Sequence, residues 1–143
     1  MLYEALFVPP GADPFPRELV DRPDLARYVR DWGQMKGDIA LVAEWEGNLT
    51  GAIWGRMFPA EKAGYGFVDA ATPEISIAIV LDHRGNGIGT KLLLAFEKAC
   101  LVQGIRQLSL SVDKRNPALR LYQRAGFEVF KEEDWALTMM KKL

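Results

Sequence analysis

The chain has 143 residues, a length that predicts one compact domain over residues 1–143. Its composition is 49% hydrophobic and 26% charged, as in ordinary globular proteins, and its net charge of -1 gives no overall attraction to nucleic acid. A single cysteine, Cys100, excludes an intrachain disulfide framework, and no stretch approaches the ~18 apolar residues of a membrane helix. We therefore expect a cytoplasmic protein with neither a signal peptide nor a membrane anchor.

The first third of the chain predicts one strand and two short helical pieces. Residues 2–8 are mostly apolar and are followed by two prolines and a glycine, which predicts a short first strand. Residues 16–32 carry apolar side chains at helical spacing, and Pro23 divides them into two pieces.

A β-hairpin is predicted next. Residues 39–45 and 49–58 have the composition of strands, and Glu46-Gly47-Asn48 between them supplies turn residues. Residues 59–72 contain glycines and show no clear period, so we expect a loop there.

The second half of the chain is more regular. Isoleucines alternate with small residues over 75–81, which predicts a strand. A glycine-rich loop follows, then a helix that begins near Ile88 and ends at Gly104, and then another strand over 108–112.

The last segment predicts one more helix and two strands. Asn116-Pro117 is typical of a helix start, and Gly126 of a helix end. Residues 127–130 and 135–140 form the last two strands of the prediction. The sum is an α/β (α+β) fold with strand–loop–helix–strand at its centre.

The glycine-rich loop carries the chemistry that can be inferred from the residues. A pyrophosphate needs several converging donors, and backbone N–H groups at a helix N-terminus supply them. The segment HRGNGIGTK follows a strand and opens a helix, with Gly85, Gly87 and Gly89 allowing close approach of the backbone and Arg84 adding a positive charge.

Spacing excludes two cofactor classes that use such loops. A P-loop requires a glycine five residues before Gly89, where the chain has Arg84, and a lysine directly after Gly89, where it has Thr90. The dinucleotide fingerprint requires a third glycine at position 90, which is again Thr90. The remaining pattern is R-x-x-G-x-G, over Arg84, Gly87 and Gly89.

This pattern resembles the acetyl-CoA loop of the GCN5-related N-acetyltransferase (GNAT) superfamily. The segment N-P-A-x-x-L-Y-x-x-x-G-F, from Asn116 to Phe127, follows at the expected distance, so the resemblance extends over about residues 74–130. It implies a mixed, mostly antiparallel central sheet with helices on both faces, splayed between the strands at 75–81 and 107–112. It also implies transfer of an acyl group, most simply acetyl, from acetyl-CoA as cosubstrate to a primary amine.

The resemblance also implies the roles of individual residues. The N–H groups of residues 85–90 would hold the pyrophosphate, main-chain groups at 79–81 would bind the pantetheine arm and polarise the thioester, and Asn116 would bind the cofactor arm. The cofactor-binding set comprises Ile79, Val80, Leu81, Arg84, Gly85, Asn86, Gly87, Ile88, Gly89, Thr90, Asn116 and Tyr122.

Acetyl transfer to an amine requires an acid for the leaving thiolate and a neutral amine. Tyr122 is the candidate acid, because the resemblance places it near the thioester sulfur and a phenol has a suitable pKa. Glu74, at the start of the strand that presents the cofactor, is the candidate base, with a water chain as its alternative. His83 is an alternative base by residue type, because a histidine side chain can accept a proton near neutral pH, but it lies at the phosphate end. The sequence shows no cluster of Cys and His, so we expect no metal.

The resemblance implies an acceptor pocket between the N-terminal helices, the 59–72 loop and the acetyl end of the cofactor, and we expect Phe15, Trp32, Trp54 and Tyr65 to line it. Arg56 has two interpretations, as a partner of an acidic substrate group or as an ordinary surface arginine. The family often forms dimers, and the C-terminal strand WALTMMKKL is a candidate edge for a homodimer.

Two other functions stay open at this point. A non-catalytic acyl-CoA-binding or sensor domain would bind the cofactor without turnover. A nucleotide-binding module would use the same loop for ATP or NAD. The residues themselves do not specify the acceptor amine, which is a small molecule or a peptide.

Overall fold

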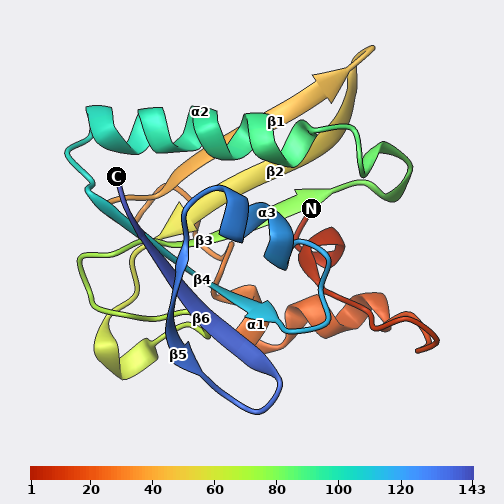
Figure 1. Cartoon of the computed structure of the whole chain (residues 1–143), viewed down its shortest axis with the longest axis horizontal. Helices are drawn as coiled ribbons and strands as arrows, with labels where there is room; N and C mark the ends of the chain where they lie inside the picture. The colour runs from red at the N-terminus through yellow and green to blue at the C-terminus, as the bar shows by residue number, and fades with distance from the viewer.

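The computed structural model describes residues 1–143 and is built on one six-stranded sheet in the order β1-β2-β3-β4-β6-β5 (Figure 1). Neighbouring strands are antiparallel except β3 and β4, which are parallel, so the predicted mixed, mostly antiparallel sheet is confirmed. The strands are β1 Ile39–Trp45, β2 Asn48–Arg56, β3 Glu74–Ile79, β4 Gln107–Asp113, β5 Glu128–Glu132 and β6 Ala136–Lys142. The α-helices are α1 Pro23–Ala26, α2 Ile88–Val102 and α3 Leu119–Arg124.

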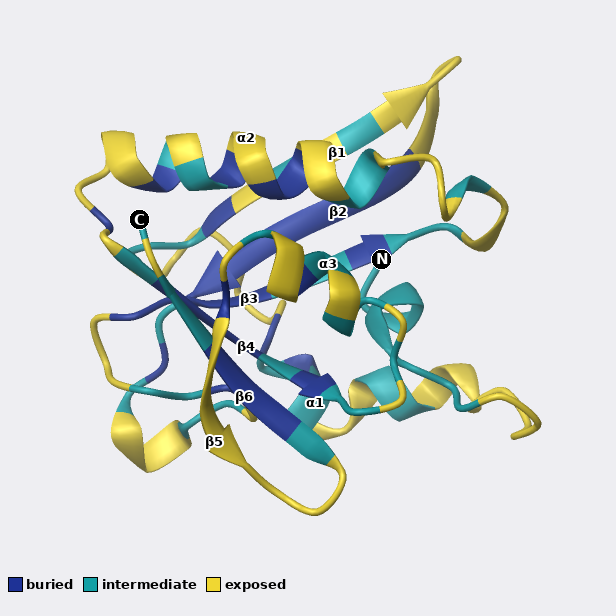
Figure 2. Cartoon of the chain, viewed as in Figure 1, coloured by how far each residue is buried: buried dark blue, intermediate teal, exposed yellow.

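The hairpin of β1 and β2 forms as the sequence predicts. Glu46 and Gly47, at its turn, both have positive φ, 50° and 78°. Two successive residues in this region produce a tight turn whose twist matches that of the strands. β2 is then enclosed between β1 and β3, and Figure 2 shows it as a largely buried strand.

The α2 helix covers one face of the sheet, where it lies along β1 and β2 (Figure 1). Its inner residues, Leu92, Leu93 and Phe96, pack with Ile53 and Ile75 of the central strands. The α3 helix contributes to the same core, so the apolar faces predicted for both helices are confirmed.

The opposite face of β2 and β3 is covered by the N-terminal segment, and here one prediction was wrong. Residues 2–8 do not form a strand; Tyr3–Ala5 is instead a single turn of 3-10 helix. Leu2 and Ala5 pack from this turn onto Trp54. The turn brings apolar residues spaced three apart onto one side, which buries them against the sheet, whereas an added strand would have left half of them exposed.

A buried ion pair fixes the following helical pieces to the sheet. Arg56 is 2% exposed, so its interpretation as a surface or substrate-pairing arginine was wrong. Its guanidinium donates to both carboxylate oxygens of Asp38, at 2.8 and 2.7 Å, and to the carbonyls of Arg27 and Arg30. Trp32 stacks over the same guanidinium, 4.9 Å from its ring centroid. Two hydrogen bonds from this one side chain therefore join the helical pieces to β2, and two more hold Asp38, directly before β1.

β3 and β4 meet at one end only. Glu74 and Ser109 are the only pair of residues that bridges the two strands, and the N–H of Ser109 donates to the carbonyl of Pro73. Beyond this point the two strands separate, which confirms the splay that was predicted between them. The splay opens the sheet at its centre, between α2 and α3.

The C-terminal strand is not an edge. β6 is paired with β4 on one side and with β5 on the other, so the prediction of an interface edge there was wrong. The last edge is β5, whose residues are all exposed (Figure 2). None of the helices combines the length and the apolar character needed to cross a membrane.

We predict that Asp38→Asn lowers the free energy of unfolding by about 3–5 kcal/mol, because it leaves the buried Arg56 without a countercharge. Chemical denaturation measures the change. The matched control is Lys131→Ala, which breaks the exposed pair with Glu133 and should cost no more than about 1 kcal/mol. Equal effects of the two variants would contradict a special role for the buried pair.

Candidate functional site

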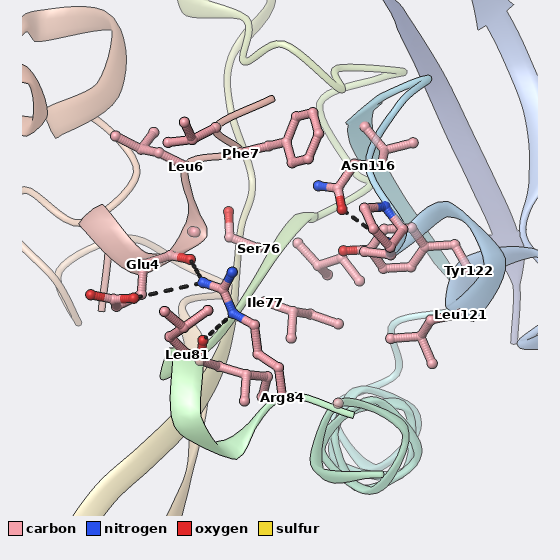
Figure 3. A pocket seen from close by; sticks show the side chains of 18 of the residues that line it. Glu4, Leu6, Phe7, Ser76, Ile77, Leu81, Arg84, Asn116, Leu121 and Tyr122 are labelled. Carbon is pink, nitrogen blue, oxygen red and sulfur yellow. Dashed lines mark hydrogen bonds and ion pairs between the residues drawn. The ribbon is translucent and has the colours of Figure 1, made fainter. Parts of the chain in front are cut away.

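The splay between β3 and β4 opens into a cleft of about 980 Å³. One wall consists of β3 with the N-terminal segment, and the other of the residues that lead into α3. The 81–90 loop closes one end. Figure 3 shows the side chains of Asn116 and Tyr122 on one side of the cleft and those of Ser76 and Ile77 on the other. The strand, the glycine loop and the Asn116–Tyr122 segment that the sequence analysis selected therefore line one cleft.

The loop end of the cleft presents main-chain donors. The consecutive N–H groups of residues 85–90 donate to no acceptor in the protein, and the first helical bond is that of the Lys91 N–H to the Gly87 carbonyl, 3.1 Å long. No side chain caps α2. Unpaired N–H groups at the positive end of a 15-residue helix form a site for an anionic group.

The glycines of this loop have two different physical roles. Gly85 and Gly87 have φ of 77° and 75°, a region that residues with a Cβ rarely adopt. A Cβ at either position would meet nothing within 4 Å, so the requirement is conformational. Gly89 is required by packing, because a Cβ there would lie 3.2 Å from Leu121 of α3.

Arg84 lines the same cleft, but its side chain runs away from the loop N–H groups. Its Nε donates to the carbonyl of Ile79 at 2.9 Å, and its Nη2 lies 3.7 Å from a carboxylate oxygen of Glu4 (Figure 3). Its main-chain N–H donates to the carbonyl of Leu81. The guanidinium thus joins the end of β3 to the N-terminal segment.

The main chain of β3 requires one correction to the predicted cofactor set. The N–H of Val80 donates to Thr50 of β2, and its carbonyl accepts from His83, so neither group is free for a ligand. Because antiparallel pairing alternates along a strand, Ile77 and Ile79 direct their N–H groups to the opposite side, into the splay. Ile77, which the sequence prediction did not include, therefore offers a main-chain N–H group to the splay, whereas Val80 offers none.

The other wall carries Asn116 and Tyr122. Asn116 Oδ1 accepts the N–H of Ala118 at 2.9 Å, which leaves its Nδ2 group without a partner in the protein. Tyr122 is 8% exposed and packs edge-on against Phe127. Its hydroxyl makes no hydrogen bond within the protein, and burial raises the pKa of Tyr122 to about 12. The phenol is therefore a neutral donor at physiological pH.

Glu74, the candidate base, occupies the end of the cleft away from the loop, and its side chain is buried. Its Oε1 accepts the Tyr28 hydroxyl at 2.7 Å and the Gly66 N–H at 2.8 Å, while Oε2 has no partner. A Cβ at Gly64 would overlap Oε2, so this glycine lets the loop close over the carboxylate. Burial raises the pKa of Glu74, although both hydrogen bonds oppose the shift.

Tyr28 is the residue of this site that the sequence did not single out. Its hydroxyl donates to Glu74, accepts the Tyr65 N–H at 2.8 Å and lines the cleft. Helical spacing indicated only that Tyr28 lies on an inner face. Phe15 and Tyr65 line the cleft as predicted, whereas Trp32 stacks on Arg56 and Trp54 is buried under the N-terminal turn, so neither contributes to it.

Comparison with known proteins gives a family match over most of the chain. The model of the acetyltransferase (GNAT) family matches residues 3–127. No curated protein sequence matches significantly.

Several solved structures share this fold. The GNAT domain of S. lividans PAT has a TM-score of 0.72 at 19% identity, and the match covers 99% of this chain and 81% of that one. PaiA N-acetyltransferase from Thermoplasma acidophilum, in complex with coenzyme A, has a TM-score of 0.62 at 24% identity, covering 75% and 62%. YncA, a putative acetyltransferase from Salmonella typhimurium with its cofactor acetyl-CoA, has a TM-score of 0.62 at 26% identity, covering 75% and 65%. The matched part thus spans less than two-thirds of the length of the last two.

Proposed function

Because the chain belongs to the acetyltransferase (GNAT) family, we propose that it transfers an acetyl group from acetyl-CoA to a primary amine by direct attack of the amine on the thioester. The observation that carries the proposal is the unpaired run of N–H groups over residues 85–90 at one end of the cleft. Acetyl-CoA consists of a nucleotide with a pyrophosphate and a long pantetheine arm that carries the acetyl group. The N–H groups of the loop suit the pyrophosphate, and the splay between β3 and β4 has room for the arm.

The cofactor-binding residues act mainly through the backbone. The N–H groups of residues 85–90 hold the pyrophosphate, with Arg84 at the edge of the site. The N–H groups of Ile77 and Ile79 face the splay and hold the arm, and one of them polarises the thioester carbonyl. Asn116 offers its free Nδ2 group from the opposite wall.

Tyr122 supplies the proton for the leaving thiolate. Its hydroxyl is neutral and has no other partner, so its proton is available for transfer. Burial disfavours the charged form of a thiol as it does that of a phenol, so a thiolate that departs beside Tyr122 is a base for the phenol proton.

Glu74 receives the proton of the attacking amine, with Tyr28 between them. The Tyr28 hydroxyl lines the cleft and already donates to Glu74 Oε1. It accepts a proton from the amine nitrogen as it passes its own proton to the carboxylate. The C–N bond forms, the C–S bond breaks, and Tyr122 protonates the sulfur, so one proton enters at Glu74 and one leaves from Tyr122.

Thermal unfolding with separate ligands tests the cofactor assignment. Acetyl-CoA or CoA at a hundredfold over its Kd should stabilise the protein by about 2.7 kcal/mol, whereas NAD and ATP should have little effect. Gly87→Ala should reduce the ligand effect because the loop cannot keep its positive φ. Gly11→Ala is the matched control, since Gly11 has the same positive φ with nothing within 4 Å and lies outside the loop. Stabilisation by NAD or ATP alone would rule the proposal out.

We predict that Tyr122→Phe lowers kcat by about 10²–10⁴-fold, the range for loss of a general acid, and leaves the affinity for acetyl-CoA within about twofold. Steady-state thiol release gives kcat, and ligand-induced stabilisation gives the affinity. An unchanged kcat would remove Tyr122 from the reaction. Cofactor binding without turnover in the wild-type protein, across all amines tried, would favour the sensor function instead.

A pH profile tests Glu74. A base must be ionised, so kcat/KM of the wild-type enzyme should rise with pH through the raised pKa of Glu74, above the ordinary range of a carboxyl group. Glu74→Gln should lower kcat/KM by about 10²–10⁴-fold and abolish this rise, while the amide oxygen still accepts from Tyr28 and Gly66. A variant that keeps the wild-type pH profile would show that the proton leaves by another path, such as a chain of waters.

A further inference from the structure

The end of the cleft away from the loop has largely apolar walls. We call it the acceptor end; its apolar surface comes from six of the cleft-lining residues, Leu6, Phe7, Phe15, Leu25, Tyr28 and Tyr65, and the polar side chain of Ser76 lies beside them. Figure 3 shows the Phe7 ring directed into the cleft, across from Asn116. Phe15 is 36% exposed and Tyr65 is 55% exposed, so aromatic surface stays open at the rim.

Glu74 is the only charged side chain that lines this end. The other residues of the cleft wall with an ionisable side chain of acid or base type are Glu4, His83, Arg84 and Arg124. Arg84 pairs with Glu4 and binds the Ile79 carbonyl. Ile79 lies five positions along β3 from Glu74, about 16 Å away at the usual rise per residue.

The other two charged side chains also lie away from Glu74. His83 precedes the glycine loop at the opposite end of β3, and Arg124 belongs to α3, across the splay. A charged group on the acceptor, next to an amine that binds near Tyr28 and Glu74, therefore reaches none of these side chains.

The cation nearest to Glu74 in the fold does not enter the cleft. Arg27 donates to the carbonyls of Asp24 and Ala63, and its guanidinium lies over the rings of Tyr28 and Tyr65. It is not among the residues that line the cleft. A carboxylate on the acceptor thus has no countercharge to meet.

These charges restrict the acceptor. A carboxylate next to the amine would have to leave water for apolar walls without a cation, and burial of an unpaired charge costs several kcal/mol. A second ammonium would face the same cost, since Glu74 is the one carboxylate available. An apolar or aromatic body pays no such penalty and gains by leaving water.

We infer that the acceptor is a primary amine with an apolar, preferably aromatic, body that carries neither a carboxylate nor a second cation. The inference rests on the proposed function and specifies its substrate class. Free amino acids, polyamines and aminoglycosides are excluded by the same argument. A proton leaves the amine through Tyr28 to Glu74 at the point where the apolar walls converge.

Matched pairs of amines test the inference with the wild-type protein. Thiol release from acetyl-CoA is followed with 2-phenylethylamine against phenylalanine, which adds a carboxylate, and with pentylamine against 1,5-diaminopentane, which adds a cation. The first member of each pair should have a kcat/KM at least about tenfold higher. Equal or better turnover of phenylalanine or of the diamine overturns the inference.

A variant adds the missing charge. Phe15→Arg places a cation at the rim of the acceptor end, where the side chain is already partly exposed. It should reduce the ratio of kcat/KM for 2-phenylethylamine to kcat/KM for phenylalanine by about tenfold. Val102→Arg adds the same charge at the far end of α2, at a residue 88% exposed, and should leave the discrimination unchanged. An equal response of both variants would show that only net charge matters.

The two proposals fail in distinguishable ways. If acetyl-CoA does not stabilise the protein, the acetyl-transfer function itself is wrong. If acetyl-CoA stabilises it but neither 2-phenylethylamine nor pentylamine is acetylated, the inferred acceptor class is wrong, while cofactor binding stands.

Discussion

The single point of pairing between β3 and β4 is the constraint on which the rest of this structure depends. Their register is limited to Glu74 and Ser109, and from there the strands diverge. Divergence leaves the N–H groups of Ile77 and Ile79 without a neighbouring strand, and unpaired main-chain groups must find a partner in water or in a ligand. It also opens the core between α2 and α3, where the cleft lies. The same gap that interrupts the pairing of the sheet thus creates the cleft that we propose as the binding site.

The acceptor end depends on a second anchor, the buried pair of Arg56 and Asp38. Although burial opposes ionisation, the hydrogen bonds from Arg56 hold the pKa of Asp38 below its usual value. Arg56 also binds the Arg27 carbonyl, directly before Tyr28 in the chain. Because this backbone is fixed, the Tyr28 hydroxyl is held between Glu74 and the 59–72 loop. A structural ion pair therefore positions a side chain that we assign to proton transfer.

In the function that we propose, the two ends of the cleft recognise their ligands by different physical means. The loop end uses neutral N–H dipoles, so it attracts an anion without a buried cation. The far end uses apolar walls around one carboxyl group, whose pKa is raised by its burial. Between them lies Tyr122, which burial keeps protonated. Burial raises the pKa of both Glu74 and Tyr122, and no neighbouring negative charge contributes to either increase.

The sequence by itself determined the features that depend on short-range patterns. Alternation and turn residues located the β1–β2 hairpin, glycine spacing located the 84–89 loop, and the family pattern implied the splay. Tertiary structure alone decided the features that depend on contacts between distant segments. Arg56 meets Asp38 across 18 residues and Tyr28 meets Glu74 across 46, and no local pattern encodes such pairings. Residues 2–8 follow the same rule, because their apolar side chains suit a strand or a turn equally, and only the surface of Trp54 and Ala78 selects the turn that buries them.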